Sequence, residues 1–172
     1  MAQLVNDMLY LAKADHGLLM PKREPLALAE EVDVLLEFFA PLAEDARVTL
    51  KRDGHARLQG DRSMLRRALS NLLDNALRFT PAGGEVRVRI IDRVDGLRLT
   101  VENSGDGISA DLLPRLFDRF YRADPARHEG SSEHAGLGLA ITQSIVRAHG
   151  GQIRCESADG WTRFVIELPK GD

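Results

Sequence analysis

Residues 62–80 carry hydrophobic positions that recur at the repeat of an α-helix. Four apolar side chains share one stripe at about 3.6 residues per turn: Leu65, Leu69, Leu72 and Ala76. We expect an amphipathic helix that turns this stripe to the core, with Asp61 as its N-terminal cap. A neighbouring stripe is polar and consists of Arg67, Asn71, Asn75 and Arg78. Because asparagine prefers caps and turns to helix interiors, Asn71 and Asn75 suggest a ligand outside the helix; a solvated polar face is the simpler alternative.

Similar patterns predict the other elements. Helices are expected over residues 2–16, 29–45 and 136–149, and Pro41 is expected to bend or end the second of them. Turns at Asp53-Gly54 and Asp95-Gly96 should each follow a strand and lead into the next one. Strands are expected over residues 23–28, 47–52, 56–59, 85–92, 97–102, 152–156 and 162–168. Strands and helices do not alternate strictly, which favours an α+β fold: a two-layer α/β sandwich with a mixed, mostly antiparallel sheet packed on three helices.

The N-terminal helix leaves two interpretations open. Its apolar stripe comprises Leu4, Met8, Leu11 and then Leu18. The helix is either the end of a helical hairpin that begins before this chain, or a helix docked on the same domain. The residues His16-Gly17 are expected to end it.

Composition narrows the class of protein. The 172 residues suggest one domain with a short appendage. The 23 basic and 26 acidic residues give a net charge of −3, which argues against a nucleic-acid partner because such a partner needs a basic stripe. Cys155 is the single cysteine, so it forms neither an internal disulfide nor a cysteine metal cage. We expect Cys155 and Trp161 to serve in packing, and His149 to stabilise the helix dipole or to cap carbonyls at a helix end.

Two glycine-bearing loops suggest a nucleotide site. The first, ENSGDGI at residues 102–108, follows a predicted strand, and the second, HAGLGL at residues 134–139, opens a predicted helix. Glycines before a helix let backbone N–H groups face an anion such as a phosphate. An asparagine oxygen suits Mg²⁺, Arg78 could neutralise a phosphate, and Asn103 could bond a base edge. The Gly-Lys-Ser/Thr sequence of a Walker site is absent.

Taken together, these segments resemble the catalytic ATP-binding domain of bacterial sensor histidine kinases, in the superfamily of gyrase and the heat-shock-chaperone ATPases. NLLDNALRFT at residues 71–80 resembles the family's N box, and ENSGDGI resembles its G1 box. LFDRFYRAD at residues 116–124 resembles the F box, and HAGLGLAIT at residues 134–142 resembles the G2 box. The wider phrases around them are most similar to kinases that respond to copper or other heavy metals. The resemblance implies the GHKL, or Bergerat, ATP-binding fold.

The resemblance also implies a site for ATP and Mg²⁺. Asn75 would hold the metal and Asn71 would lie beside it in the metal–phosphate network, while Arg78 would contact phosphate; these three would carry the catalysis. Phe117, Phe120 and Tyr121 would start the ATP lid, with core packing as an equal alternative for the two phenylalanines. The implied nucleotide-binding residues are Asn71, Asn75, Arg78, Asn103, Gly105, Gly107, Ile108, Tyr121, Gly136, Leu137, Gly138, Leu139 and Thr162.

Two positions depart from the family pattern. Asn103 stands where the family usually has an aspartate that accepts from the adenine amino group, and a neutral acceptor makes a weaker bond. Glu102 is adjacent, but on a strand it should point to the opposite face. His134 replaces the first glycine of the G2 box. Both departures suggest modest nucleotide affinity.

The related ATPases carry a glutamate as general base at the position of Asn71. A carboxamide cannot take a proton, so water should be poorly activated and the γ-phosphoryl group should await a histidine. None of the five histidines of this chain has the family's acceptor pattern, and we therefore expect a fragment. Residues 1–20 would be the end of the dimerisation and phosphotransfer helix with its linker, and residues 21–172 the catalytic domain.

The expected function is transfer of the ATP γ-phosphoryl group to a histidine on a dimerisation hairpin absent from this chain. The whole protein would be a homodimer, anchored in the bacterial inner membrane with this domain in the cytoplasm, and would pass phosphate to a response regulator. The fragment should be mostly monomeric. Two alternatives stay open: a non-catalytic nucleotide-sensing module, favoured by Asn103 and His134, and a water-using ATPase, disfavoured by Asn71.

Overall fold

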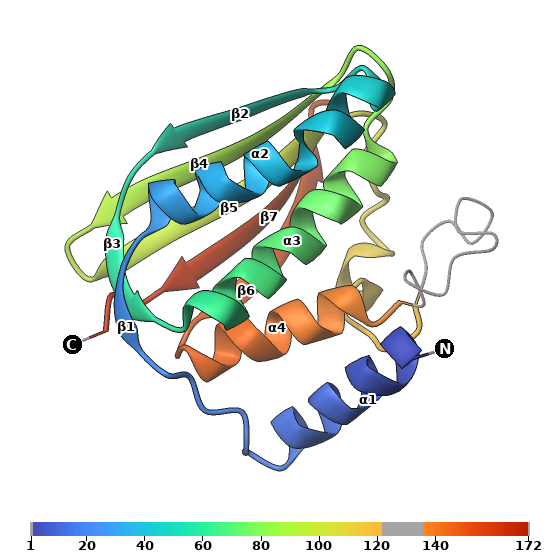
Figure 1. Cartoon of the computed structure of the whole chain (residues 1–172). Helices are drawn as coiled ribbons and strands as arrows, with labels where there is room; N and C mark the ends of the chain where they lie inside the picture. Colours follow the sequence, from blue (N-terminus) through green and yellow to red (C-terminus); the bar gives the residue numbers. More distant parts are fainter. Residues whose placement is uncertain (1, 122–135, 172) are drawn as a thin grey trace.

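The protein folds into two layers, a five-stranded sheet and a set of helices that cover one of its faces (Figure 1). The computed structural model describes residues 2–121 and 136–171. His134 and the last residues of the predicted F box lie outside these ranges. The helices are α1 (Ala2–Asp15), α2 (Leu28–Ala46), α3 (Arg62–Phe79), α4 (Gly138–Ala148) and the short 3-10 helix η1 (Leu113–Arg115). The strands are β1 (Glu24–Ala27), β2 (Thr49–Gly54), β3 (Arg57–Gly60), β4 (Glu85–Arg93), β5 (Gly96–Ser104), β6 (Gln152–Ala158) and β7 (Trp161–Leu168).

The main sheet has the strand order β2-β4-β5-β7-β6. Only the β2–β4 pair is parallel, and the other three pairs are antiparallel. Helices α2, α3 and α4 lie on one face of this sheet, and within the described residues the opposite face carries no helix (Figure 1). The predicted α+β class, the mostly antiparallel sheet and the three covering helices are confirmed. Within the described ranges, no helix has the length and apolar content needed to cross a membrane.

The apolar stripe of α3 forms the centre of the core, as its spacing predicts. Its members are all buried: Leu65, Leu69, Leu72 and Ala76. Strands β4, β5 and β7 meet this stripe with alternate apolar side chains, for example Val86, Val101 and Phe164. Because a strand turns successive residues to opposite faces, the intervening positions point to the outer face of the sheet.

The start of α3 and the end of α4 are joined through His149. The Asp61 N–H donates to His149 Nε2 at 3.0 Å, so Nδ1 carries the ring proton and donates to the Ile145 carbonyl at 2.9 Å. Asp61 also caps α3, since its Oδ1 accepts from the Met64 N–H at 3.0 Å. The predicted capping roles of Asp61 and His149 are both confirmed. Burial is the main reason that the pKa of His149 is lowered.

The expected turn at Asp53-Gly54 is wrong. Gly54 is the last residue of β2, where it pairs with Ile90 of β4, and its φ is 87°. Strand β3 does not follow β2 in a hairpin but pairs with β1 in a separate two-stranded sheet. An Asp-Gly pair is a local turn signal, and it carries no information on which distant strand each flanking segment will meet.

Pro41 does not end α2, which continues for five more residues to Ala46. The ring removes one helical hydrogen bond, to the carbonyl of Glu37. Both residues are exposed, so water can serve the carbonyl that Pro41 leaves without a donor. Where the missing bond faces solvent, a proline interrupts the ladder without stopping the helix.

Helix α1 lies beside α4, on the side away from the sheet (Figure 1). Leu11 is buried, whereas Met8 and Leu18 of the predicted stripe are 49% and 60% exposed. The buried Asp7 side chain accepts from Arg67 of α3 at 2.7 Å. The helix is therefore docked on the domain. That α1 also ends a dimerisation hairpin, and that a boundary falls at residue 20, stay predictions.

Candidate functional site

The two asparagines on the polar stripe of α3 differ in their hydrogen bonds. Asn71 Nδ2 donates to the carbonyl of Gly138 at 3.1 Å and lies 3.4 Å from the hydroxyl of Thr142. That hydroxyl donates to the same Gly138 carbonyl at 2.8 Å. Asn71 therefore ties the middle of α3 to the first turn of α4, and its amide nitrogen is committed to that role.

Asn75 lies one turn further along α3 and is half-buried. Within the described part of the chain, no side-chain hydrogen bond of Asn75 is found. Its carboxamide oxygen is thus available to a ligand, which fits the chemistry of a Mg²⁺ site. Arg78, on the same stripe, forms an ion pair with Asp74 at 3.5 Å. Residues 2–121 and 136–171 contain no group of three or more His, Cys, Asp or Glu side chains placed for a metal.

The N-terminus of α4 has the features of an anion site. Leu137 is the N-cap residue, and it provides no side-chain hydrogen bond to the first turn. The first N–H groups of a helix have no partner inside it, and the helix dipole favours negative charge there. The side chain of Leu137 is buried and that of Leu139 is packed against the core. Any contact of these two predicted residues with a ligand would therefore come from the backbone.

Three of the other predicted residues, Asn103, Ile108 and Thr162, meet at the end of β5. Asn103 and Thr162 are cross-strand neighbours in β5 and β7, and both are buried on the helix side of the sheet. Asn103 Nδ2 donates to the carbonyl of Ser104 at 3.2 Å, so its Oδ1 is the group left to accept. The Ile108 N–H donates to Ser157 of β6 at 2.8 Å, and Ser157 lies 3.4 Å from the Thr162 hydroxyl.

The glycines of the loop after β5 permit close approach. Gly105 adopts a φ of 151°, and its N–H donates to the carbonyl of Gly160 at 3.0 Å. A Cβ at Gly105 would lie 3.4 Å from the Phe79 carbonyl at the end of α3. A Cβ at Gly107 would lie 2.6 Å from the Ser157 hydroxyl. The loop is thus packed against the C-terminal end of α3, one turn beyond Asn75.

The two ends of the predicted lid meet each other. The Phe120 N–H donates to the carbonyl of Gly136 at 3.0 Å, and a Cβ on Gly136 would lie 2.6 Å from the Phe120 backbone. Phe117 packs edge-on against Phe164 in the core, with 6.1 Å between ring centroids. Phe120 is 53% exposed, and the Tyr121 ring lies under the guanidinium of Arg115. Of the two phenylalanines, only Phe117 serves in packing.

The structure therefore brings the predicted residues to one region around the C-terminal half of α3. The chain that follows β5 runs from the end of α3 toward the start of α4 (Figure 1). Sequence reasoning missed Thr142 and Ser157. Thr142 stands one turn after Gly138, where its hydroxyl can reach back, and Ser157 is the polar member of a strand face otherwise formed by Ile153 and Cys155. Both positions could have been recognised from the sequence pattern.

A known family matches this fold and this arrangement. The profile of the family described as "Histidine kinase-, DNA gyrase B-, and HSP90-like ATPase" matches residues 60–172, which is more than half of the chain. The chain belongs to this family, whose membership assigns ATP binding to the domain. The fold that the resemblance implies is thereby confirmed.

The similar proteins are sensor kinases. The sensor histidine kinase CusS of Escherichia coli K12 is 52% identical over 171 residues, which is 98% of this chain and 35% of that protein. The chain thus spans about a third of the length of this curated relative. Among solved structures, the mycobacterial sensor histidine kinase MprB is 33% identical with a TM-score of 0.74, covering 86% of this chain and 97% of that one. Full-length ShkA in complex with AMPPNP is 26% identical with a TM-score of 0.83, covering 96% and 35%.

Proposed function

We propose that this chain is the catalytic domain of a sensor histidine kinase, which binds Mg²⁺-ATP and gives its γ-phosphoryl group to a histidine outside the chain. The observation that carries the proposal is the junction of α3 and α4. There Asn71 holds the uncapped N-terminus of α4 against the helix whose next turn offers the Asn75 carboxamide. Phosphate oxygens at the helix N-terminus would lie beside a metal on Asn75.

The base of the nucleotide belongs at the other end of the site. Asn103 Oδ1 would accept from the adenine amino group, with the Thr162 hydroxyl beside it. Gly105 and Gly107 would let the backbone approach the base and sugar closely. That the similar ShkA has been solved with AMPPNP, an adenine nucleotide analogue, supports this assignment of the ligand.

The residues favour transfer to a histidine over hydrolysis. Phosphoryl transfer needs mainly positioning and neutralisation of charge, and bound Mg²⁺ supplies positive charge to the phosphate oxygens. In the step itself, the bond from the γ-phosphorus to the leaving oxygen of ADP would break while a bond to the acceptor imidazole nitrogen forms, and the ring would release its N–H proton to water. Asn71 accepts no proton, and its amide nitrogen is bonded to Gly138. Water therefore lacks a base at this position, which argues against the ATPase alternative.

The partners of the whole protein belong to the same proposal. The acceptor histidine would lie on a dimerisation hairpin that α1 completes, in a homodimer anchored in the bacterial inner membrane, and the phosphate would pass to a response regulator. The 52% identity to CusS supports a place among such sensor kinases, and the resemblance of the segments around the four boxes to kinases that respond to heavy metals supports the metal-responsive subgroup.

A second candidate function is a nucleotide-sensing module without transfer. Asn103 favours it, because a neutral acceptor binds the adenine amino group more weakly than a carboxylate does. Such a module would bind ATP or ADP and change how α1 docks, and would phosphorylate nothing.

One assay separates these functions. The chain is mixed with γ-labelled ATP, Mg²⁺ and a separately produced acceptor hairpin from a sensor kinase. We expect acid-labile label on the hairpin; binding without label on the hairpin supports the sensing module, and free phosphate alone supports the ATPase.

The metal assignment has its own variant. Asn75→Ala should remove the Mg²⁺-dependent part of ATP binding, since it removes the carboxamide oxygen. Asn6→Ala, on the exposed surface of α1, is the matched control and should bind as the parent does. Unchanged Mg²⁺-dependent binding by the Asn75 variant would refute the metal site.

A further inference from the structure

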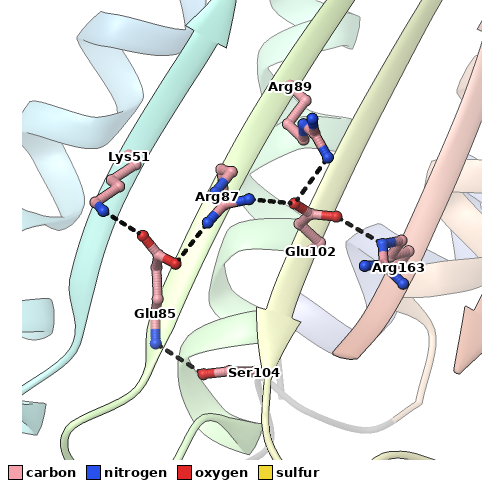
Figure 2. Close-up of polar contacts among 7 residues, drawn as sticks. All are labelled: Lys51, Glu85, Arg87, Arg89, Glu102, Ser104 and Arg163. Carbon is pink, nitrogen blue, oxygen red and sulfur yellow. Dashed lines mark hydrogen bonds and ion pairs between the residues drawn. The ribbon is translucent and has the colours of Figure 1, made fainter. Parts of the chain in front are cut away.

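The outer face of the sheet holds a buried carboxylate behind the nucleotide site. Glu102 lies on β5, and its side chain is only 1% exposed although no helix of the described ranges covers this face. Figure 2 shows why: guanidinium groups from both neighbouring strands converge on it. These guanidinium groups belong to Arg87 and Arg89 on β4 and to Arg163 on β7.

The contacts of Glu102 differ on its two oxygens. Arg163 Nε donates to Oε2 at 2.7 Å, and Oε1 lies 3.3 Å from Arg87 Nη1 and 3.6 Å from Arg89 Nη1. Arg87 also reaches Glu85 at 2.9 Å, and Glu85 in turn binds Lys51 of β2 at 2.8 Å. The network thus links four adjacent strands (Figure 2). The hydrogen bond from Lys51 is the largest reason that the pKa of Glu85 is lowered.

The Trp161 ring stacks against two of these guanidinium groups. It lies under the guanidinium of Arg87 at 5.1 Å and under that of Arg163 at 5.9 Å. Stacking on the ring limits where each guanidinium can go, because a cation over an aromatic face is attracted to it. Two of the three arginines that contact Glu102, Arg87 and Arg163, are therefore themselves held in place.

Glu102 is the neighbour in sequence of Asn103, the residue proposed to bind the base. Asn103 follows it directly, and its side chain lies on the opposite, helix side of β5. In the ladder, Glu102 pairs with Arg163 and Asn103 pairs with Thr162. Glu102 and Arg163, which form one ion pair on the outer face, are thus each adjacent in sequence to one residue of the proposed site on the inner face. Movement of the Glu102 carboxylate would be transmitted to Asn103 and Thr162 within one residue.

We infer that Glu102 is a positioning residue for recognition of the nucleotide base, acting through Asn103. The inference rests on the proposed function, which places adenine at Asn103. A neutral carboxamide makes a weaker bond than a carboxylate, so its affinity depends more on accurate placement of the acceptor. The ion pairs of Glu102 with β4 and β7 hold that end of β5 in register.

The test compares base-dependent with phosphate-dependent binding. Glu102→Gln keeps the size of the side chain but presents an amide N–H₂ to the guanidinium groups. We expect its affinity for Mg²⁺-ATP to fall about fivefold to tenfold, the effect of one weakened hydrogen bond. Its affinity for Mg²⁺-tripolyphosphate, which has no base, should stay within about twofold. Both are measured by competition with a fluorescent ATP analogue, together with the melting temperature.

The matched control is Glu167→Gln. Glu167 is on β7, on the same sheet face, and pairs with Arg98 and Arg154, but it lies at the end of the strand far from Thr162. This variant should leave the ratio of the two affinities unchanged, whatever it does to stability. A loss of ATP and tripolyphosphate affinity in equal measure in Glu102→Gln, or no loss of either, would overturn the positioning role.

A second variant tests the inference if Glu102→Gln does not fold. Arg89→Gln removes only the longest contact, at 3.6 Å, from a half-exposed side chain, and should lower the ATP-to-tripolyphosphate ratio about twofold. An unchanged ratio there, with an unfolded Glu102 variant, also overturns the inference. If the parent chain itself binds no ATP, the proposed function fails; if it binds ATP and the ratio does not move, only the positioning role fails.

Discussion

Replacing Asn71 with aspartate tests the junction between α3 and α4. The substitution keeps the shape of the side chain but puts a carboxylate oxygen where Nδ2 now donates to Gly138 at 3.1 Å. A lost hydrogen bond of this kind lowers the free energy of unfolding by about 1 kcal/mol, and facing one acceptor with another lowers it by a further ~1–3 kcal/mol. The negative charge of the aspartate near the N-terminus of α4 offsets up to ~1 kcal/mol of this loss in the free energy of unfolding. With that offset in full, the net destabilisation is about 1–3 kcal/mol.

Thermal unfolding measures this difference. For a chain of this size, each kcal/mol moves the melting temperature by about 2–4 °C, so Asn71→Asp should melt roughly 2–12 °C lower. Asn71→Ala removes the bond without the repulsion and should lie between that variant and the parent. Asn75→Asp is the matched control, one turn along the same stripe, and should be nearly neutral because no bond of Asn75 is found within the described residues.

The order of the melting temperatures tests whether the Asn71 amide nitrogen donates to Gly138. If Asn71→Asp is as stable as the parent, or more stable than Asn71→Ala, the amide nitrogen does not donate to Gly138. Asn71 would then not secure the N-terminus of α4, and the observation that carries the proposed function would be wrong.

Two other predictions concern protonation and the lid. His149 has a lowered pKa, so the unfolded chain binds its proton more tightly; the stability that the neutral ring contributes with Asp61 is complete above the ordinary value of 6.5 and is lost as the pH falls toward the folded-state pKa. Chemical denaturation between pH 5 and 8 should show this loss, and His149→Gln should abolish that slope; an unchanged slope would contradict the assignment. Gly136→Ala would press a methyl group against the Phe120 backbone at a φ of 89°, and should weaken ATP binding several-fold with a smaller effect on melting. Gly17 has a similar φ and open space around it, so Gly17→Ala should leave ATP binding unchanged; equal weakening in both variants would refute the role of the contact between Gly136 and Phe120.

Much of the site could be predicted from the order of short motifs. The Asn71 and Asn75 stripe, the loop at Gly105 and Gly107 and the glycines before α4 are local features, and the family match confirms the class that they indicated. The separate role of each asparagine could not be predicted. Asn71 and Asn75 are chemically identical and share one stripe, and only the approach of α4 commits the first of them to a structural bond.

The sequence by itself determined which segments form helices and strands, which face of α3 enters the core, and where glycine permits a positive φ. Those properties depend on residues within a few positions of one another, because helix and strand periodicity and backbone freedom are local. Only the tertiary structure decided that β2 pairs with β4 in place of β3, that His149 meets Asp61, and that three arginines enclose Glu102 behind Asn103. These contacts join residues far apart in the chain, and their partners are selected by how the layers pack.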